Sequence, residues 1–154
     1  MKRELMSWEE CGKHIRGVTI DLDKVRSMVK LCRVRLRVVQ QIKLDEETAS
    51  IIAENYYEII KELLTAFLLL AGRKSDNHEC LIAFFKKSFP EKEYELGVIY
   101  ELKSIRNAID YEGLFVEKSY LERNKLEFVH IIEFLNKEIE EKLKNTKNQS
   151  PLQP

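Results

Sequence analysis

Apolar residues recur at spacings of three and four along most of this chain, which is the period of a helix that buries one face. The series Val25, Met28, Cys32, Leu36 and Val39 is a clear example. Glycine and proline are sparse, with five and three copies in 154 residues, so the chain has few breaks for turns. The pattern therefore favours a few long helices over many short strands.

Five helices are expected where the apolar period runs between residues that start or stop a helix. They are a helix capped by Asp21 or Asp23 that runs to about Ile42, one that follows the acids of 45–48 and ends at Gly72, one capped by Ser75 or Asp76 that stops before Pro90, one from Glu91 to Tyr111, and one from about Glu117 to Lys144. Long helices with one apolar face bury it against each other. The predicted fold class is all-α, an antiparallel bundle of four to five helices.

A single domain is expected, because 154 residues with 44% apolar content can fill one core. Residues 1–20 show no strong period and are expected to form a short turn of helix and an extended lead-in. The bundle is expected to span residues 21–144. Residues 145–154 have almost no apolar content, so they are expected to be disordered.

The 26 basic and 26 acidic residues balance, which argues against a protein that coats nucleic acid by its overall charge, and DNA binding is not expected. One local exception is the basic stripe, Arg26, Lys30, Arg33 and Arg37, at helical spacing opposite the apolar face. One interpretation is that the stripe binds RNA phosphates or the acidic surface of a partner. The other is that it is a solvated face whose charge is balanced by acids of the second and fifth helices. The sequence leaves both interpretations open.

The three cysteines, Cys11, Cys32 and Cys80, are an odd number without close pairing, and the amino terminus has no secretion signal. Reduced cysteines and a cytoplasmic location are therefore expected, with Cys32 and Cys80 as small core residues. The most apolar stretch, Leu63–Ala71, is too short to cross a bilayer, so no membrane association is expected.

Two mixed pairs, Cys11-x-x-His14 and His78-x-Cys80, could together offer four zinc ligands, but neither has the tight Cys-x-x-Cys or His-x-x-x-His spacing of structural sites. No metal site and no cofactor are expected. A Gly-rich phosphate loop, a Gly-x-Ser-x-Gly elbow and a His-Glu-x-x-His motif are all missing from the sequence, which argues against most common enzyme classes.

The candidate chemistry is concentrated near the end of the fourth helix, where Arg106, Asn107, Asp110 and Tyr111 form one polar patch at helical spacing. Arg106 can clamp a phosphate with its planar fork while Asn107 orients it. Alternatively, Arg106 pairs with Asp110 four residues later, and Tyr111 packs in the core with its hydroxyl at the rim.

A further candidate, His78, lies in the first turn of the third helix, where its ring can hydrogen-bond a phosphate or reach the Arg106 patch. The alternative is a helix cap or an interhelical hydrogen bond.

The Arg106-Asn107 pair gives the chain a resemblance to the HEPN family, helical-bundle proteins whose signature is an Arg, a polar residue that is usually Asn, and a His after a spacer of four to six residues. Tyr111, which three residues separate from Asn107, stands near the position of that His. Residues 55–60, 71–72 and 75–81 also look like the second and third helices of archaeal-type members. The resemblance covers roughly residues 21–143.

Membership in this family implies an antiparallel bundle, usually a homodimer in which two copies of the Arg motif face one cleft. Many members are metal-independent endoribonucleases, toxins paired with a small nucleotidyltransferase, and others only bind nucleotides or partners. Tyrosine at the histidine position is a poor base at neutral pH. In toxin members a Tyr just beyond the His receives nucleotides, which makes Tyr111 a candidate for such modification.

Taken together, the sequence predicts a HEPN-like homodimer that binds RNA, a nucleotide or a nucleotidyltransferase through a cleft lined by Arg106, Asn107, Asp110 and Tyr111. One alternative is a metal-independent, toxin-like endoribonuclease that uses Arg106 with His78 or Tyr111. A second alternative is a purely structural helical adaptor.

Overall fold

The computed structural model describes residues 5–148. Within them it has five α-helices, a short 3-10 helix and a two-stranded sheet. The elements in chain order are η1 (Glu10–His14), β1 (Ile15–Gly17), α1 (Leu22–Gln41), α2 (Ala49–Leu70), β2 (Arg73–Ser75), α3 (His78–Ser88), α4 (Glu93–Glu112) and α5 (Lys118–Asn148). The predicted helical bundle is confirmed, with each long helix near its expected place.

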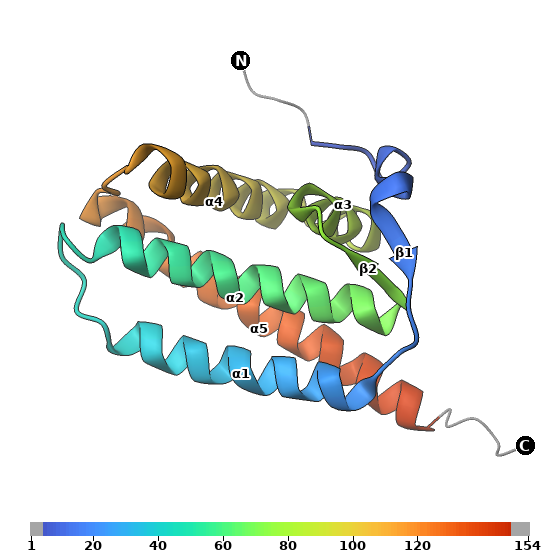
Figure 1. The fold of residues 1–154 in the computed structure, drawn as a ribbon. Helices are drawn as coiled ribbons and strands as arrows, with labels where there is room; N and C mark the ends of the chain where they lie inside the picture. Colours follow the sequence, from blue (N-terminus) through green and yellow to red (C-terminus); the bar gives the residue numbers. More distant parts are fainter. Residues whose placement is uncertain (1–4, 149–154) are drawn as a thin grey trace, which may run out of the picture.

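The central helix of the bundle is α2, which packs against all four other α-helices. Figure 1 shows α1 on one side of α2, and α3 and α4 on the other. Neighbouring pairs such as Ile59–Ile60 and Leu63–Leu64 are fully buried, so α2 has apolar contacts on several sides. A helix that is apolar on most of its surface is stable only when it is surrounded. The few polar groups on α2 are therefore placed where a neighbouring helix can pair with them.

The ends of the helices follow local capping rules. At α1, the Asp21 carboxylate accepts a hydrogen bond from the backbone N–H of Lys24 at 3.1 Å, as one of the two predicted caps. The cap of α3 was predicted wrongly as Ser75 or Asp76. It is Asn77, whose side chain accepts from the backbone N–H of Glu79, because Ser75 belongs to β2.

A small antiparallel sheet was not predicted. β1 pairs with β2 in the register Ile15↔Ser75, Arg16↔Lys74 and Gly17↔Arg73. Three-residue strands are too short to show alternation in sequence, so neither strand has a period that predicts it. The pairing fixes the N-terminal segment against the connection between α2 and α3 (Figure 1).

Helix α5 continues to Asn148, so residues 145–148 are helical where disorder was predicted. The rest of that predicted tail, residues 149–154, lies outside the described residues. None of the helices in the described part of the chain has the length and apolar character needed to span a membrane.

Cys11 and Cys80 form a disulfide across 69 residues of sequence, and both are fully buried. The expectation of three reduced cysteines is therefore wrong for this pair. The bond joins η1 to the first turns of α3. Cys32 remains a free thiol in the core, and burial raises its pKa to about 11, so it stays protonated.

Candidate functional site

Charged side chains of α2 and α4 face each other along the line where the two helices pack. We call this set the α2–α4 seam: Glu54, Glu58 and Lys61 of α2, with Lys103, Arg106 and Asp110 of α4. In both helices these residues recur at spacings of three and four, which places them on one face. The seam brings Arg106 and Asp110 together with acids of α2 that the sequence analysis did not select.

Arg106 lies at the middle of the seam, and its side chain is only 20% exposed. Its Nη2 is 3.7 Å from the Glu58 carboxylate, and its Nε is 3.1 Å from the Asp110 carboxylate. The Nε–H is buried and makes no hydrogen bond of good geometry within the described residues, so the contact with Asp110 is ionic. Nη1 donates a weak hydrogen bond of 3.4 Å to the Asn107 side-chain oxygen. The predicted pairing of Arg106 with Asp110 is confirmed.

The outer end of the seam is acidic. Burial, followed by the nearby charge and hydrogen bond of Asp110, raises the pKa of Glu54 above its ordinary value. Glu54, Glu58 and Asp110 thus lie around Arg106, and Glu58 also pairs with Lys61 at 2.8 Å. A phosphate approaching the isolated protomer would have to displace a carboxylate from Arg106, so the guanidinium is not an open anion site.

His78 of α3 lies beside Tyr57, which Arg106 of the seam also contacts. Its Nδ1 lies 3.1 Å from the Tyr57 hydroxyl, and the Arg106 guanidinium lies over the Tyr57 ring, 5.7 Å from its centroid. The predicted interhelical hydrogen bond of His78 is thus present, and Tyr57 joins His78 to Arg106. This role of Tyr57 could not be predicted from the sequence, because Tyr57 lies within an apolar helix and has the pattern of a core residue.

Burial lowers the pKa of His78, and the positive charges of Lys61, Arg106 and Lys103 lower it further, against an opposing effect of Glu58. The imidazole is therefore neutral at pH 7. A neutral imidazole can accept a proton, so His78 could act as a base.

The depressed pKa of His78 makes the stability of the fold depend on pH. As the pH falls below 6.5, the unfolded chain takes up a proton at His78 before the folded chain does. The stabilisation from neutral His78 is thus present above pH 6.5 and is lost as the pH falls towards the lowered folded value. Urea unfolding of the parent and of His78→Gln from about pH 8 to about pH 5 should show the parent losing more stability. Equal losses of stability in the two proteins would contradict a lowered pKa of His78 in the folded state.

Tyr111 does not line the seam. It is 81% exposed at the last turn of α4, so the predicted packing of this ring in the core is wrong. Close by, Leu114 and Phe115 of the loop after α4 are 42% and 73% exposed, and Ile51 at the start of α2 is 54% exposed. We call these four residues the apolar end. Sequence analysis missed Leu114 and Phe115, because the loop 113–117 has no period that marks a buried or exposed face, and it did not select Ile51 of α2.

Ser50 fixes the loop of the apolar end. Its hydroxyl accepts a hydrogen bond from the backbone N–H of Val116 at 2.7 Å and donates one to the carbonyl of Leu114 at 3.0 Å. These bonds hold the loop against the start of α2, beside Ile51, at the end of the bundle where α2 begins and α4 stops (Figure 1). Phe115 is therefore presented to solvent from a fixed backbone.

Substitution Ser50→Ala is expected to lower the free energy of unfolding by about 1–3 kcal/mol, because it removes the hydrogen-bond partner of the buried Val116 N–H and of the part-buried Leu114 carbonyl. Chemical denaturation followed by circular dichroism measures this loss. Ser104→Ala is the matched control, since that hydroxyl bonds only to its own helix at an exposed position and its loss should cost less than about 0.5 kcal/mol. Equal effects of the two substitutions would show that Ser50 does not hold the loop.

The basic stripe is exposed on the outer face of α1, across α2 from α4 (Figure 1). Arg26 pairs with Asp23 of its own helix at 3.3 Å, and Arg33 pairs with Glu140 of α5. The structure thus supports the interpretation of a charge-balanced face for Arg26 and Arg33. For Arg33 the balancing acid lies on the fifth helix, as expected. Lys30 and Arg37 are exposed without an ion pair to any described residue. The stripe and Arg106 do not form one surface.

Comparisons of the chain with protein-family models, with curated proteins and with solved structures gave no match.

Proposed function

We propose that this protein is a HEPN-like helical bundle that acts as a binding module. Its apolar end pairs with a second copy of the chain, and the two seams brought together then bind a nucleotidyltransferase partner, RNA or a nucleotide. The observation that carries the proposal is that four large apolar side chains, those of the apolar end, are exposed beyond Asp110 at one end of the α2–α4 seam. Single exposed apolar residues are common, but a group of them marks an interaction site.

The composition and rigidity of this surface suit a protein interface. Tyrosine, phenylalanine and arginine are enriched in the centres of protein–protein interfaces, where they supply much of the binding energy. Tyr111 and Phe115 offer two exposed aromatic rings at the apolar end. Because the bonds of Ser50 already hold the Phe115 loop in place, little conformational entropy is lost when a partner covers it.

Charge favours a protein partner over RNA as the first ligand of the isolated protomer. Arg106 is already neutralised by Glu58 and Asp110, and Glu54 adds a further carboxyl group. These groups repel phosphate and can pair with basic residues of a protein. RNA or nucleotide binding then requires the rearranged surroundings that a second protomer provides.

Self-association is tested by sedimentation of the parent and of Phe115→Glu over a range of concentrations. The charge placed on the apolar end is expected to weaken the dimer at least about tenfold. Leu31→Glu is the matched control, since Leu31 is an equally apolar, 50% exposed residue on α1 and its replacement should leave the dimer intact. A parent that is monomeric at all concentrations, or equal weakening by both variants, would refute the proposal.

The runner-up is a metal-independent endoribonuclease, and one observation favours it. Neutral His78 and Arg106 contact the same Tyr57 side chain, which puts a proton acceptor near a charge that could stabilise a phosphate. His78 can accept a proton at Nε2 only in the tautomer whose Nδ1–H donates to the Tyr57 hydroxyl.

Catalysis is tested by incubating RNA with the parent, Arg106→Ala and His78→Gln in the presence of a chelator. Cleavage by the parent that both substitutions abolish would establish the ribonuclease and displace the binding-only function. If no protein cleaves RNA but Arg106→Ala weakens the binding of RNA or of a partner, the binding module stands. Unchanged binding in Arg106→Ala would favour the structural adaptor.

A further inference from the structure

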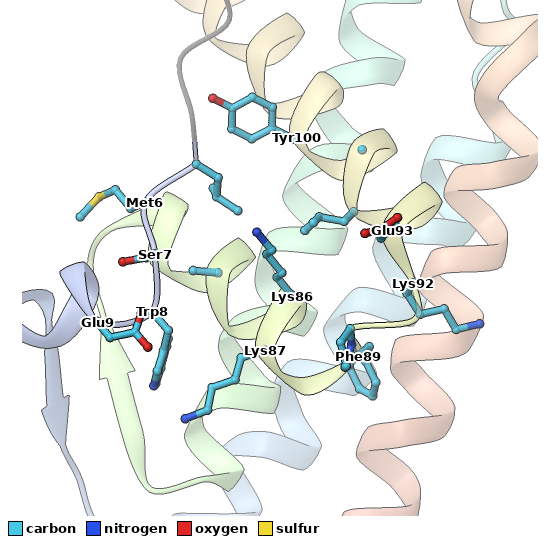
Figure 2. Close-up of a pocket in the computed structure, with 15 residues that line it drawn as sticks. Met6, Ser7, Trp8, Glu9, Lys86, Lys87, Phe89, Lys92, Glu93 and Tyr100 are labelled. Atoms are coloured by element: carbon cyan, nitrogen blue, oxygen red, sulfur yellow. The ribbon is translucent and has the colours of Figure 1, made fainter.

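A cavity of about 780 Å³ lies between the N-terminal segment, α3 and the first half of α4 (Figure 2). It shares no lining residue with the α2–α4 seam or the apolar end. Its volume falls within the range of about 300–1,000 Å³ that is typical of sites for small organic ligands.

The walls of the cavity are mainly apolar and are held in position. The apolar lining is formed by Leu5, Met6, Trp8, Ala83, Phe89, Pro90 and Leu96. The Cys11–Cys80 disulfide ties the chain that follows Trp8 to α3, and the Trp8 ring packs 5.3 Å from the Phe84 ring. The N-terminal wall is therefore attached to the bundle by a covalent bond and by an aromatic contact.

Gly97 lines the cavity from within α4, where glycine destabilises a helix relative to alanine. A Cβ atom at this position would have no neighbour within 4 Å, so close packing does not explain the glycine. Its φ is not in the left-handed region, so no backbone conformation requires it either. The effect of Gly97 is to leave open space above α4.

Three lysines and two glutamates lie around this space. Lys87 is placed over the Trp8 ring at 5.0 Å, and Lys92 is directed away, over the Phe134 ring of α5 at 4.7 Å. Lys86 makes no ion pair or ring contact with any described residue. Figure 2 shows its side chain extending from α3 into the space between the N-terminal segment and α4, with Glu93 on the far side.

We propose that this cavity binds a small amphipathic anion, a fatty carboxylate, with its chain against the apolar walls and its carboxylate on Lys86. Burial of the chain supplies affinity, and the ammonium of Lys86 selects the charge of the head group. Lys87 adds a second positive charge to the lining on the side of Trp8, and Glu93 disfavours a head group placed next to it.

The test uses isothermal titration calorimetry of the full chain with decanoate below its micellar concentration. Decanol and decyltrimethylammonium have the same chain with a neutral or a positive head group. Saturable binding of decanoate is expected, at least about tenfold tighter than decanol, with no binding of the cation.

Two substitutions test the geometry without touching the core. Lys86→Glu is expected to weaken decanoate binding at least about tenfold, and Gly97→Leu to abolish it by filling the space while favouring the helix. Lys125→Glu, the same charge change at an exposed position of α5 outside the cavity lining, should leave binding unchanged. Absence of saturable binding by the parent, equal binding of the cation, or unchanged binding by Lys86→Glu or Gly97→Leu would overturn the proposal.

Discussion

Replacing Phe85 by alanine is expected to lower the free energy of unfolding by about 3–5 kcal/mol. Phe85 is fully buried on α3, with its ring 5.2 Å from that of Phe89 and 6.3 Å from that of Phe134 on α5. The Phe89 and Phe134 rings in turn lie 4.8 Å apart. Truncation removes apolar surface from the junction of α3 and α5 and leaves a cavity that the fixed helices cannot close.

The matched control is Tyr94→Ala, the truncation of an aromatic side chain that is 63% exposed on α4 and lies outside the apolar end. It should alter stability by less than about 0.5 kcal/mol. Guanidinium unfolding of both variants and the parent gives the comparison. A loss below about 1 kcal/mol for Phe85→Ala would mean that α3 is not packed on α5 as described. A large loss for Tyr94→Ala would mean that truncating an exposed ring also destabilises the fold, and the test would then not be specific to the core.

Removal of the disulfide should have a similar effect. The Cys11→Ala, Cys80→Ala double variant is expected to lose about 4 kcal/mol, because the bond closes a loop of 69 residues and so restricts the unfolded chain. The control is the unfolding free energy of the parent with and without a dithiol reductant, because reduction breaks the cross-link and keeps both cysteine side chains. Loss of stability in the double variant but not in the reduced parent would assign the cost to packing instead of the cross-link.

Thiol titration in denaturant tests the same pairing directly. One reactive thiol, that of Cys32, is expected before reduction, and three are expected after it. Three thiols before reduction would show that the cross-link does not form. The result also bears on location, since structural disulfides are rare in the reducing cytosol. The expected cytoplasmic location rested on unpaired cysteines, a premise that the pairing of Cys11 and Cys80 removes.

The helices could be predicted from sequence because their apolar period is local and repeats over many residues. Non-local features could not. The pairing of β1 with β2 and the Cys11–Cys80 bond both join the N-terminal segment to the start of α3, and neither has a signal within its own few residues. The cap of α3 was misplaced by one or two residues for the same reason, since Ser75 is held in a strand that was not expected.

The candidate site also contains one local contact that could be predicted and non-local contacts that could not. Arg106 and Asp110 are one helical turn apart, so their pairing follows from spacing alone. The contacts of Arg106 with Glu58 and Tyr57 depend on how α4 is rotated against α2, which the spacing does not determine. Tyr111 shows the limit clearly, because its position past the packed part of α4 leaves it exposed although it shares the motif with Arg106.

The Cys11–Cys80 bond also determines how the chain would respond to force. A pull on its two ends would travel through the disulfide and bypass the 69-residue loop that carries α1 and α2. The oxidised chain should extend by roughly 240 Å less than the reduced chain when fully unfolded, at about 3.5 Å per residue. The central helix of the bundle thus lies in the part of the molecule that tension on the termini does not reach.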